Sequence, residues 1–252
     1  MIKIEHVVLA SPEQMEFIIE GMRNPMNSWE NSDSTSIEDG EWHNICGNSG
    51  PYNGTVTDTE TFFEMGKNDF DLMTRLRNAG TDHRKFMRMM PVYARVTAPL
   101  YWWKEFDTYK VGTVANSCST MHKIASREFT IEDFSCDRLG VIIPAEKNDG
   151  KECYQNLWLE RMEGIIIALN IARRFYIRVD DLKLKKDYWW QMIQLLPSSY
   201  NQTRNVMLNY EVLANIYKSR KDHKLDEWHD FCDWIKSLPY SKLITEKVEN
   251  IH

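Results

Sequence analysis

The sequence predicts an α+β fold, a mixed sheet flanked by helices, in a single domain spanning residues 1–252. One segment alternates apolar and polar residues, which is typical of a half-buried strand. A longer segment, residues 154–177, is apolar over a broad face at helical spacing. A chain of 252 residues is long enough to bury a sizeable core. The alternating apolar residues are Met90, Val92, Ala94 and Val96.

The N-terminal part predicts a strand, two helices and a loop between the helices. Residues 2–9 predict a short strand. A helix begins after Ser11 and continues to about residue 22, because Ser is a favoured N-cap and the Pro that follows is accepted in a first turn. Residues 24–54 are rich in Asn, Ser, Gly and Asp, which predicts a long surface loop. Residues 60–79 have the apolar spacing of a second helix.

The rest of the chain predicts one strand followed mainly by helices. The alternating strand spans residues 86–97, and Ala98-Pro99 then opens a helix that ends near Phe106. Residues 127–144 predict turns and an edge segment. The remaining predicted helices are residues 154–177, 187–195, 205–219 and 224–237.

Composition excludes several classes of protein. A formal net charge of −6 argues against general nucleic-acid binding, which favours a basic surface. The five cysteines are scattered and include no Cys-x-x-Cys pair, which indicates reduced thiols and neither a disulfide framework nor a zinc site. His223 and Glu227 have the spacing of half a metal site, but no second pair matches them, so no metal is predicted. The absence of a signal-peptide core and of a membrane-length apolar run predicts a cytoplasmic protein with no membrane partner.

Two blocks of polar residues carry the functional signal. The first follows the predicted strand, and a strand that leads into a helix and a polar loop is a common place for a ligand site. Its residues are Ala98-Pro99, Lys104-Glu105, Thr108-Tyr109-Lys110, Asn116 and Ser119. The second block lies late in the chain. Its residues are Leu196-Pro197, Tyr200, Asn209, Glu211, Asn215, Arg220, His223 and Glu227.

The order and spacing of these blocks resemble the flavin-dependent thymidylate synthases over roughly residues 83–240. In the first block, Lys104-Glu105 stands where that family has Arg-Gln, and Thr108-Tyr109-Lys110 takes the place of Arg-His-Arg. The second block is the closer match, although Glu211 replaces the Arg of an Asn-x-Arg motif.

The resemblance implies specific roles. Arg220 would be the catalytic residue, contacting the uracil ring and favouring its ionised form, and Ser119 and Lys110 would lie near the substrate phosphate. FAD would be the cofactor, with methylenetetrahydrofolate and NADPH as co-substrates, in a homotetramer whose subunits share the sites. The residues that would hold the flavin are Asn209, Asn215, His223, Tyr109 and Asn116.

The function that follows is flavin-dependent one-carbon (methyl) transfer to a pyrimidine deoxynucleotide. The alternative is a catalytically degenerate oligomer of the same fold that binds a nucleotide or flavin, and a third possibility is a purely structural oligomer. The residues by themselves leave simpler roles open. Arg220 also suits a solvated cation at a helix end, Asn209 and Asn215 suit surface amides, and Ser119 suits an ordinary turn.

Overall fold

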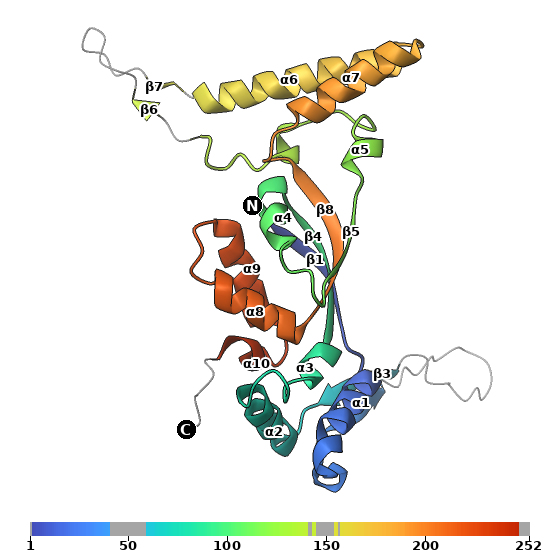
Figure 1. Ribbon diagram of the computed structural model, residues 1–252, viewed down its shortest axis with the longest axis vertical. Helices are drawn as coiled ribbons and strands as arrows, with labels where there is room; N and C mark the ends of the chain where they lie inside the picture. Colours follow the sequence, from blue (N-terminus) through green and yellow to red (C-terminus); the bar gives the residue numbers. More distant parts are fainter. Residues whose placement is uncertain (1, 41–58, 141–142, 145–153, 156, 247–252) are drawn as a thin grey trace, which may run out of the picture.

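A four-stranded sheet in the order β1-β4-β8-β5 runs along the middle of an elongated molecule (Figure 1). The computed structural model describes residues 2–40, 59–140, 143–144, 154–155 and 157–246. Every neighbouring pair in this sheet is antiparallel. The sheet and its helices confirm the α+β class. The four strands are β1 (Lys3–Leu9), β4 (Pro91–Pro99), β8 (Asn201–Asn209) and β5 (Val114–Ser117).

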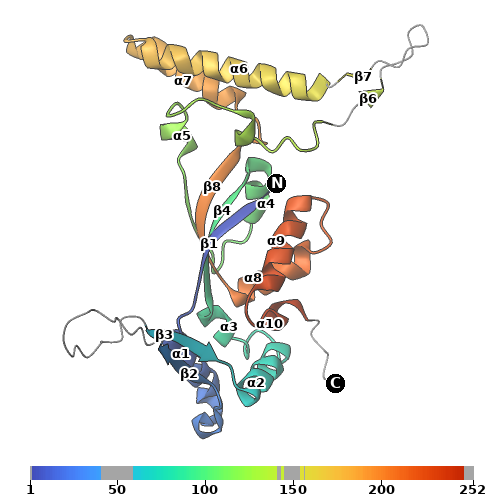
Figure 2. The same ribbon diagram turned by 180° about the vertical axis from the view of Figure 1, so that it is seen from behind.

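The sheet buries one face and exposes the other. Val92, Ala94 and Val96 of β4 are buried, whereas Tyr93 and Arg95 between them are exposed. This confirms the alternation that the sequence predicts, although the strand begins at Pro91 because a short helix, α3 (Phe86–Met89), precedes it. The helices that cover the buried face are α4 (Leu100–Phe106), α8 (Tyr210–Arg220) and α9 (Asp226–Ser237) (Figure 1, Figure 2).

Aromatic side chains fill the core where α4 meets α9. Trp102 and Trp103 on α4 are both buried, so neither ring is available to stack on a ligand. The ring centroid of Trp102 lies 4.7 Å from that of Trp228 and 5.1 Å from that of Phe106. These contacts fix α9 against α4, which positions the turn between α8 and α9.

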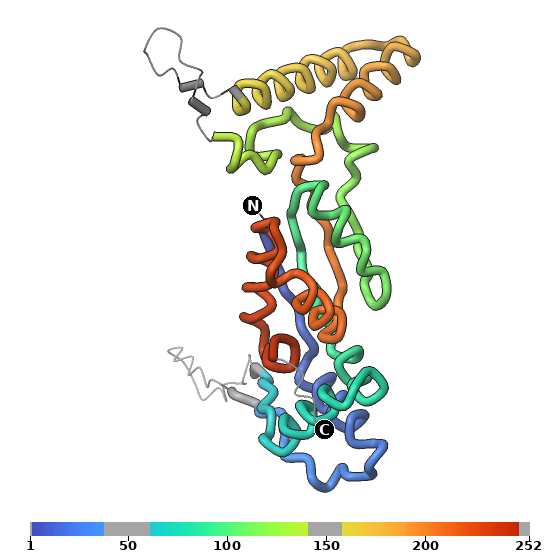
Figure 3. Tube along the Cα trace, turned by 60° about the vertical axis from the view of Figure 1, so that its left-hand side comes forward, coloured from blue at the N-terminus to red at the C-terminus, as the bar shows by residue number. Residues whose placement is uncertain are grey.

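Further elements pack at the two ends of the sheet (Figure 3). One end has α1 (Pro12–Arg23), α2 (Lys67–Asn78), α10 (Lys242–Thr245) and the hairpin of β2 (Thr35–Gly40) with β3 (Thr59–Glu64). The other end has α5 (Thr120–Lys123), α6 (Leu157–Arg178), α7 (Leu182–Leu195) and the pair β6 (Ile143–Pro144) with β7 (Tyr154–Gln155). Single 3₁₀ turns are η1 (Asn24–Met26), η2 (Trp29–Asn31) and η3 (Ile131–Asp133). Within the described ranges, no helix is long and apolar enough to cross a membrane.

The predicted start of the first helix is confirmed in detail. The Ser11 hydroxyl accepts a hydrogen bond from the Gln14 backbone N–H at 3.2 Å, and the Gln14 side chain accepts one from the Ser11 N–H at 2.9 Å. This reciprocal capping box satisfies two backbone donors at the helix start.

Several predicted helices are wrong over part of their length. The helix predicted at residues 154–177 begins only at Leu157, because Tyr154 and Gln155 form β7 and pair with β6. Residues 60–79 are divided between β3 and α2, because Gly66 breaks the helix and residues 59–64 pair with β2. Residues 205–209 belong to β8, because Val206 and Leu208 point into the core while the backbone pairs with β4 and β5. Asn209 is consequently not within a helix but at the junction of a strand and a helix.

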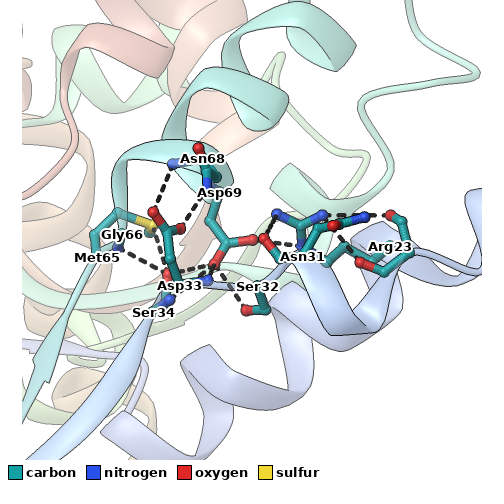
Figure 4. Close-up of polar contacts among 10 residues, drawn as sticks. Arg23, Asn31, Ser32, Asp33, Ser34, Met65, Gly66, Asn68 and Asp69 are labelled. Atoms are coloured by element: carbon teal, nitrogen blue, oxygen red, sulfur yellow. Dashed lines mark hydrogen bonds and ion pairs between the residues drawn. The ribbon is translucent and has the colours of Figure 1, made fainter.

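The first part of the predicted loop at residues 24–54 is ordered around a buried ion pair (Figure 4). Residues 24–40 contain η1, η2 and β2, and residues 41–54 lie outside the described residues. Arg23 Nε donates to Asp69 Oδ1 at 2.6 Å, and both side chains are almost fully buried. The Arg23 guanidinium also donates to the backbone oxygens of Ser28 and Asn31, at 3.1 and 2.9 Å.

The Asp69 carboxylate has an unusually complete set of donors. Its Oδ2 accepts from the hydroxyls of Ser32 and Ser34, at 2.8 and 2.7 Å, and from the backbone N–H groups of Asp33 and Ser34. Burial alone raises the pKa of Asp69, but the hydrogen bonds from Ser34, Ser32 and Arg23 outweigh it and hold that pKa below its ordinary value. Asp69 therefore stays ionised and ties the segment after Arg23 to α2.

Candidate functional site

Arg220, the last residue of α8, is held against α4 and the turn that follows α4. Its Nη1 donates to Glu105 Oε2 at 2.7 Å, and its Nε donates to the Tyr109 hydroxyl at 3.0 Å. The centre of the guanidinium lies 4.9 Å from the ring centroid of Trp228, within the range of a cation–π contact. Three side chains thus fix the orientation of Arg220.

The carboxylate of Glu105 is the centre of this cluster. Besides Arg220, its Oε2 accepts from Trp228 Nε1 at 2.9 Å and lies 3.3 Å from His223 Nε2. His223 Nδ1 accepts from the backbone N–H of Leu225 at 3.1 Å, so the neutral ring carries its proton on Nε2 and presents it to Glu105. We call Glu105, Tyr109, Arg220, His223 and Trp228 the Arg220 cluster.

The Arg220 cluster is only partly closed to solvent. The side chains of Arg220, Glu105 and His223 are 18%, 33% and 24% exposed. The described residues offer no hydrogen-bond partner to Nη2 of Arg220. The guanidinium is therefore fixed in place with one donor edge available, while the neighbouring carboxylate cancels its charge.

A cleft begins beside this cluster, at Leu225. Its volume is about 440 Å³, and the side chains around it include more acidic than basic groups. The charged residues are Asp137, Asp226, Glu227 and Asp230 against Arg138 and Lys224. Such a cleft does not attract a phosphate. Within it the Tyr101 hydroxyl donates to Glu227, and burial together with this hydrogen bond raises the pKa of Tyr101.

Asn209 lies at the opposite end of α8 from Arg220. The 11 residues of this helix separate the two by ~16 Å. The Asn209 side chain is buried, and its Oδ1 accepts from the Val212 backbone N–H at 3.0 Å, so it is the N-cap of α8. Gly112 lies over this cap with a φ of +75°, and a Cβ there would come within 2.9 Å of the Asn209 amide nitrogen. Its role as the N-cap of α8 therefore accounts for an Asn at this position without a ligand.

The other predicted site residues lie in several places. Asn215 is on the solvent face of α8, and Lys110 is exposed next to Tyr109. Ser119 caps α5, accepting from the His122 backbone N–H at 3.0 Å. Asn116 is exposed on β5, beside a shallow cleft of about 220 Å³ on the face of the sheet opposite the helices.

The structure consequently brings together three of the predicted residues, Arg220, Tyr109 and His223. The five residues implied to hold a flavin do not converge within one chain. Asn209 is a buried cap, Asn215 faces solvent, and Asn116 is on the far face of the sheet. Within the residues that the structure describes, a single chain therefore does not bring these five side chains together into one flavin-binding site.

Sequence reasoning assigned no role to Glu105 or Trp228, which complete the cluster. The sequence could have singled out Glu105, because this carboxylate stands where the flavin-dependent thymidylate synthases have Gln. Glu211 is a similar case. It stands at the position of an Arg, and it pairs with Arg84 at 2.9 Å and with Arg88. Burial raises the pKa of Glu211, but hydrogen bonds from Arg88 and Arg84 outweigh it and lower that pKa.

Of three comparisons with known proteins, the one with solved structures found similar folds. No protein-family model and no curated protein matches the chain. Among solved structures, the flavin dependent thymidylate synthase ThyX of Helicobacter pylori, complexed with FAD and dUMP, matches with a TM-score of 0.54 at 15% identity, covering 96% of this chain and 95% of that one. A second structure of that enzyme with FAD and dUMP gives a TM-score of 0.55 at 13% identity, covering 98% and 97%.

A related enzyme of different specificity is also similar. The UMP/dUMP methylase PolB of Streptomyces cacaoi, bound with 5-Br dUMP, matches with a TM-score of 0.51 at 14% identity, covering 96% of this chain and 92% of that one. Identities this low establish architecture and not chemistry. The chain therefore has the fold of the flavin-dependent thymidylate synthases along nearly its whole length.

Proposed function

We propose that this chain binds a pyrimidine deoxynucleotide with its base beside Arg220, and that it does not transfer a one-carbon unit to that base efficiently. The observation that carries the proposal is the Arg220–Glu105 pair, whose nitrogen and oxygen atoms are 2.7 Å apart. The pair holds the guanidinium in one orientation and leaves Nη2 to donate to a carbonyl oxygen of the base.

The same pair argues against catalysis. A free guanidinium stabilises the ionised form of a uracil ring by direct attraction of opposite charges. Here the Glu105 carboxylate lies against the guanidinium and opposes that attraction. A ring bound beside this pair gains a hydrogen bond, but it gains little stabilisation of negative charge.

Binding and its dependence on Arg220 form the first test. In isothermal titration calorimetry we expect dUMP to bind the wild type and Arg220→Ala to weaken binding at least about 10-fold, since hydrogen bonds from charged groups contribute roughly 1.5–3 kcal/mol. Arg95→Ala is the matched control, because Arg95 is exposed on the opposite face of the sheet. Circular dichroism checks that both variants are folded. An affinity that Arg220→Ala leaves unchanged refutes the site.

Deuterium or tritium release from C5 of labelled dUMP, with reduced flavin and methylenetetrahydrofolate, measures turnover. We expect no release above the rate without protein. Release that depends on the protein and is abolished in Arg220→Ala overturns the second half of the proposal and establishes the active alternative.

That alternative is flavin-dependent methyl transfer with FAD, methylenetetrahydrofolate and NADPH in a homotetramer. The observation that favours it is the likeness, across more than nine tenths of each chain, to enzymes whose structures contain FAD with dUMP. A flavin site would then draw residues from more than one subunit, with Asn215 on an exposed helix face and Asn116 on an exposed sheet face contributing to partner subunits. Purified protein that retains a flavin absorption band supports this alternative, and protein that takes up no added flavin excludes it.

A further inference from the structure

The Arg220 cluster leaves two hydrogen-bond donors available to a ligand. The Arg220 guanidinium uses Nε on the Tyr109 hydroxyl and Nη1 on Glu105, so Nη2 remains a donor. The Tyr109 hydroxyl accepts from Arg220, and its own proton has no acceptor among the described residues. Around the edge of the planar guanidinium, Nη2 lies between the nitrogen that contacts Tyr109 and the nitrogen that contacts Glu105.

Glu105 supplies an acceptor next to these donors. All the donors that reach its carboxylate meet at Oε2, where Arg220 Nη1 lies at 2.7 Å, Trp228 Nε1 at 2.9 Å and His223 Nε2 at 3.3 Å. No described residue donates to Oε1. An ionised carboxylate accepts hydrogen bonds and cannot donate them, so Oε1 offers a ligand an acceptor only.

The unused atoms of Arg220 and Glu105 are open to solvent. In the part of the chain that the structure describes, the buried side-chain nitrogen and oxygen atoms without a partner are Trp102 Nε1 and Thr113 Oγ1. Arg220 Nη2 and Glu105 Oε1 also have no partner but are not among these buried atoms, so solvent reaches both. Because the two side chains are in contact, a ring of pyrimidine size can reach both atoms at once.

We infer that this site prefers a cytosine ring to a uracil ring, an inference that rests on the proposed binding of a nucleotide beside Arg220. The pairing edge of cytosine has two acceptors, O2 and N3, followed by one donor, the amino group at C4. These three groups complement the Tyr109 hydroxyl, Arg220 Nη2 and Glu105 Oε1, taken in that order. Acceptance by a carboxylate from the cytosine amino group is a known form of base recognition in proteins.

A uracil ring complements the same groups less well. Its edge has an acceptor, a donor and an acceptor, which are O2, N3–H and O4. In the position that suits cytosine, N3–H would face Arg220 Nη2 and O4 would face Glu105 Oε1, donor against donor and acceptor against acceptor. A shift by one position lets N3–H donate to Oε1, but it leaves the second carbonyl oxygen beside the carboxylate. Polar groups that are left unpaired or opposed reject a ligand.

The charges beside the cluster favour the same base. The cleft that begins at Leu225 has more acidic than basic groups around it, and Asp226 and Glu227 are among the acidic ones. A negative surrounding attracts the hydrogens of an amino group and repels a carbonyl oxygen. The cleft therefore adds to the preference that the Glu105 carboxylate sets.

Calorimetric titration of the wild type with three nucleotides tests the preference. dCMP and dUMP carry the same sugar and phosphate, so a difference between their affinities at neutral pH reports the base. We expect dCMP to bind at least about 10-fold more tightly than dUMP. The deoxynucleotide of pyrimidin-2-one lacks the amino group at C4 but keeps O2 and N3. It should also bind at least about 10-fold more weakly than dCMP.

Two variants test which side chains set the preference. Glu105→Gln should lower the ratio of dCMP affinity to dUMP affinity about 10-fold or more, because a Gln amide can donate to O4 of uracil. Tyr109→Phe should weaken binding of dCMP more than binding of dUMP. The ratio is the readout because a loss of stability, or of the orientation of Arg220, weakens both nucleotides. Glu13→Gln makes the same chemical change on an exposed side chain of α1 and should leave the ratio unchanged.

The outcomes separate this inference from the proposed function. A wild type that binds dUMP as tightly as dCMP overturns the inference, and so does a Glu105→Gln variant that keeps the wild-type ratio. The proposed function survives either result if Arg220→Ala still weakens binding. A wild type that binds neither nucleotide overturns both, whereas binding of dCMP alone that depends on Arg220 supports both.

Discussion

Two arginine–carboxylate pairs in this protein have the same chemistry, but one is buried and the other is partly exposed to solvent. Arg23 and Asp69 are 4% and 0% exposed, and the pair ties the segment after α1 to α2. Arg220 and Glu105 are 18% and 33% exposed, and they lie where a helix end meets a turn. In both pairs the charged nitrogen and oxygen are less than 3 Å apart.

The two pairs differ in what remains unsatisfied. Asp69 accepts from Arg23, from two serine hydroxyls and from backbone N–H groups, so the pair has no capacity left for a ligand. At Arg220 the described residues leave Nη2 without an acceptor, and solvent reaches the site. A short ion pair thus does not by itself distinguish a structural cluster from a binding site, whereas the count of unsatisfied donors does.

The largest effect is expected from breaking the buried pair. Asp69→Asn leaves the Arg23 guanidinium buried without its counter-charge, which should lower the free energy of unfolding by about 3–5 kcal/mol. Urea denaturation followed by tryptophan fluorescence measures this loss. A loss of less than about 1 kcal/mol would mean that the pair lies in more polar surroundings than its burial indicates.

Acidification should lower the free energy of unfolding of the wild type, because it protonates Asp69. This loss should be smaller than the loss caused by Asp69→Asn, which removes the charge at every pH. The folded-state pKa of Asp69 is lowered relative to an unfolded value of about 3.9. Its contribution to stability is therefore fully present above the unfolded pKa and is lost as pH falls through the lower, folded pKa. Urea denaturation midpoints should be measured between neutral pH and pH 3. The difference between the midpoints of wild type and Asp69→Asn should become smaller as the pH falls. A gap that stays constant would contradict the assignment to Asp69.

The smallest effect on stability, and the most informative about function, is expected at Glu105. Because Glu105 is one third exposed, Glu105→Gln should change the free energy of unfolding by at most about 1 kcal/mol. The change removes the negative charge beside Arg220 but keeps an acceptor, so affinity for dUMP should rise about 3- to 10-fold, by roughly 0.7–1.4 kcal/mol. Calorimetric titration of wild type and variant measures the difference.

Glu105→Gln also tests why turnover is expected to be absent. If neutralisation of Arg220 is the obstacle, the variant should release C5 hydrogen from labelled dUMP faster than the wild type. Weaker binding by this variant would show that the carboxylate holds Arg220 in place and that the ion pair is required for the site.

Local sequence patterns predicted the elements whose signals lie close together in the chain. The alternation from Met90 to Val96 specified β4 and its buried face, and Ser11 with Pro12 specified the start of α1. The spacing of the late polar block drew attention to Arg220, and the structure places Tyr109 and His223 beside it. These features depend on neighbouring residues, so their physical causes are visible in a short window of sequence.

Other features depended on partners far away along the chain. Asp33 caps α2 from outside the helix, accepting from the backbone N–H groups of Asn68 and Asp69 at 2.9 and 3.1 Å. Residues 205–209 form a strand because β4 pairs with all of them and β5 pairs with residues 205–207 on the other side. The helical spacing of their apolar residues competes with that pairing and is overridden by it.

The sequence by itself determined the fold class, the main amphipathic segments and the position of Arg220 in a polar block. Only the tertiary structure decided what Arg220 does with its charge, since Glu105 is 115 residues away and Trp228 comes from the next helix. It also decided that Asn209 is a helix cap and that Asn116 lies on the other face of the sheet. The physical reason is that periodicity and capping act within a few residues, whereas an ion pair forms between whichever charges the packing of helices brings together.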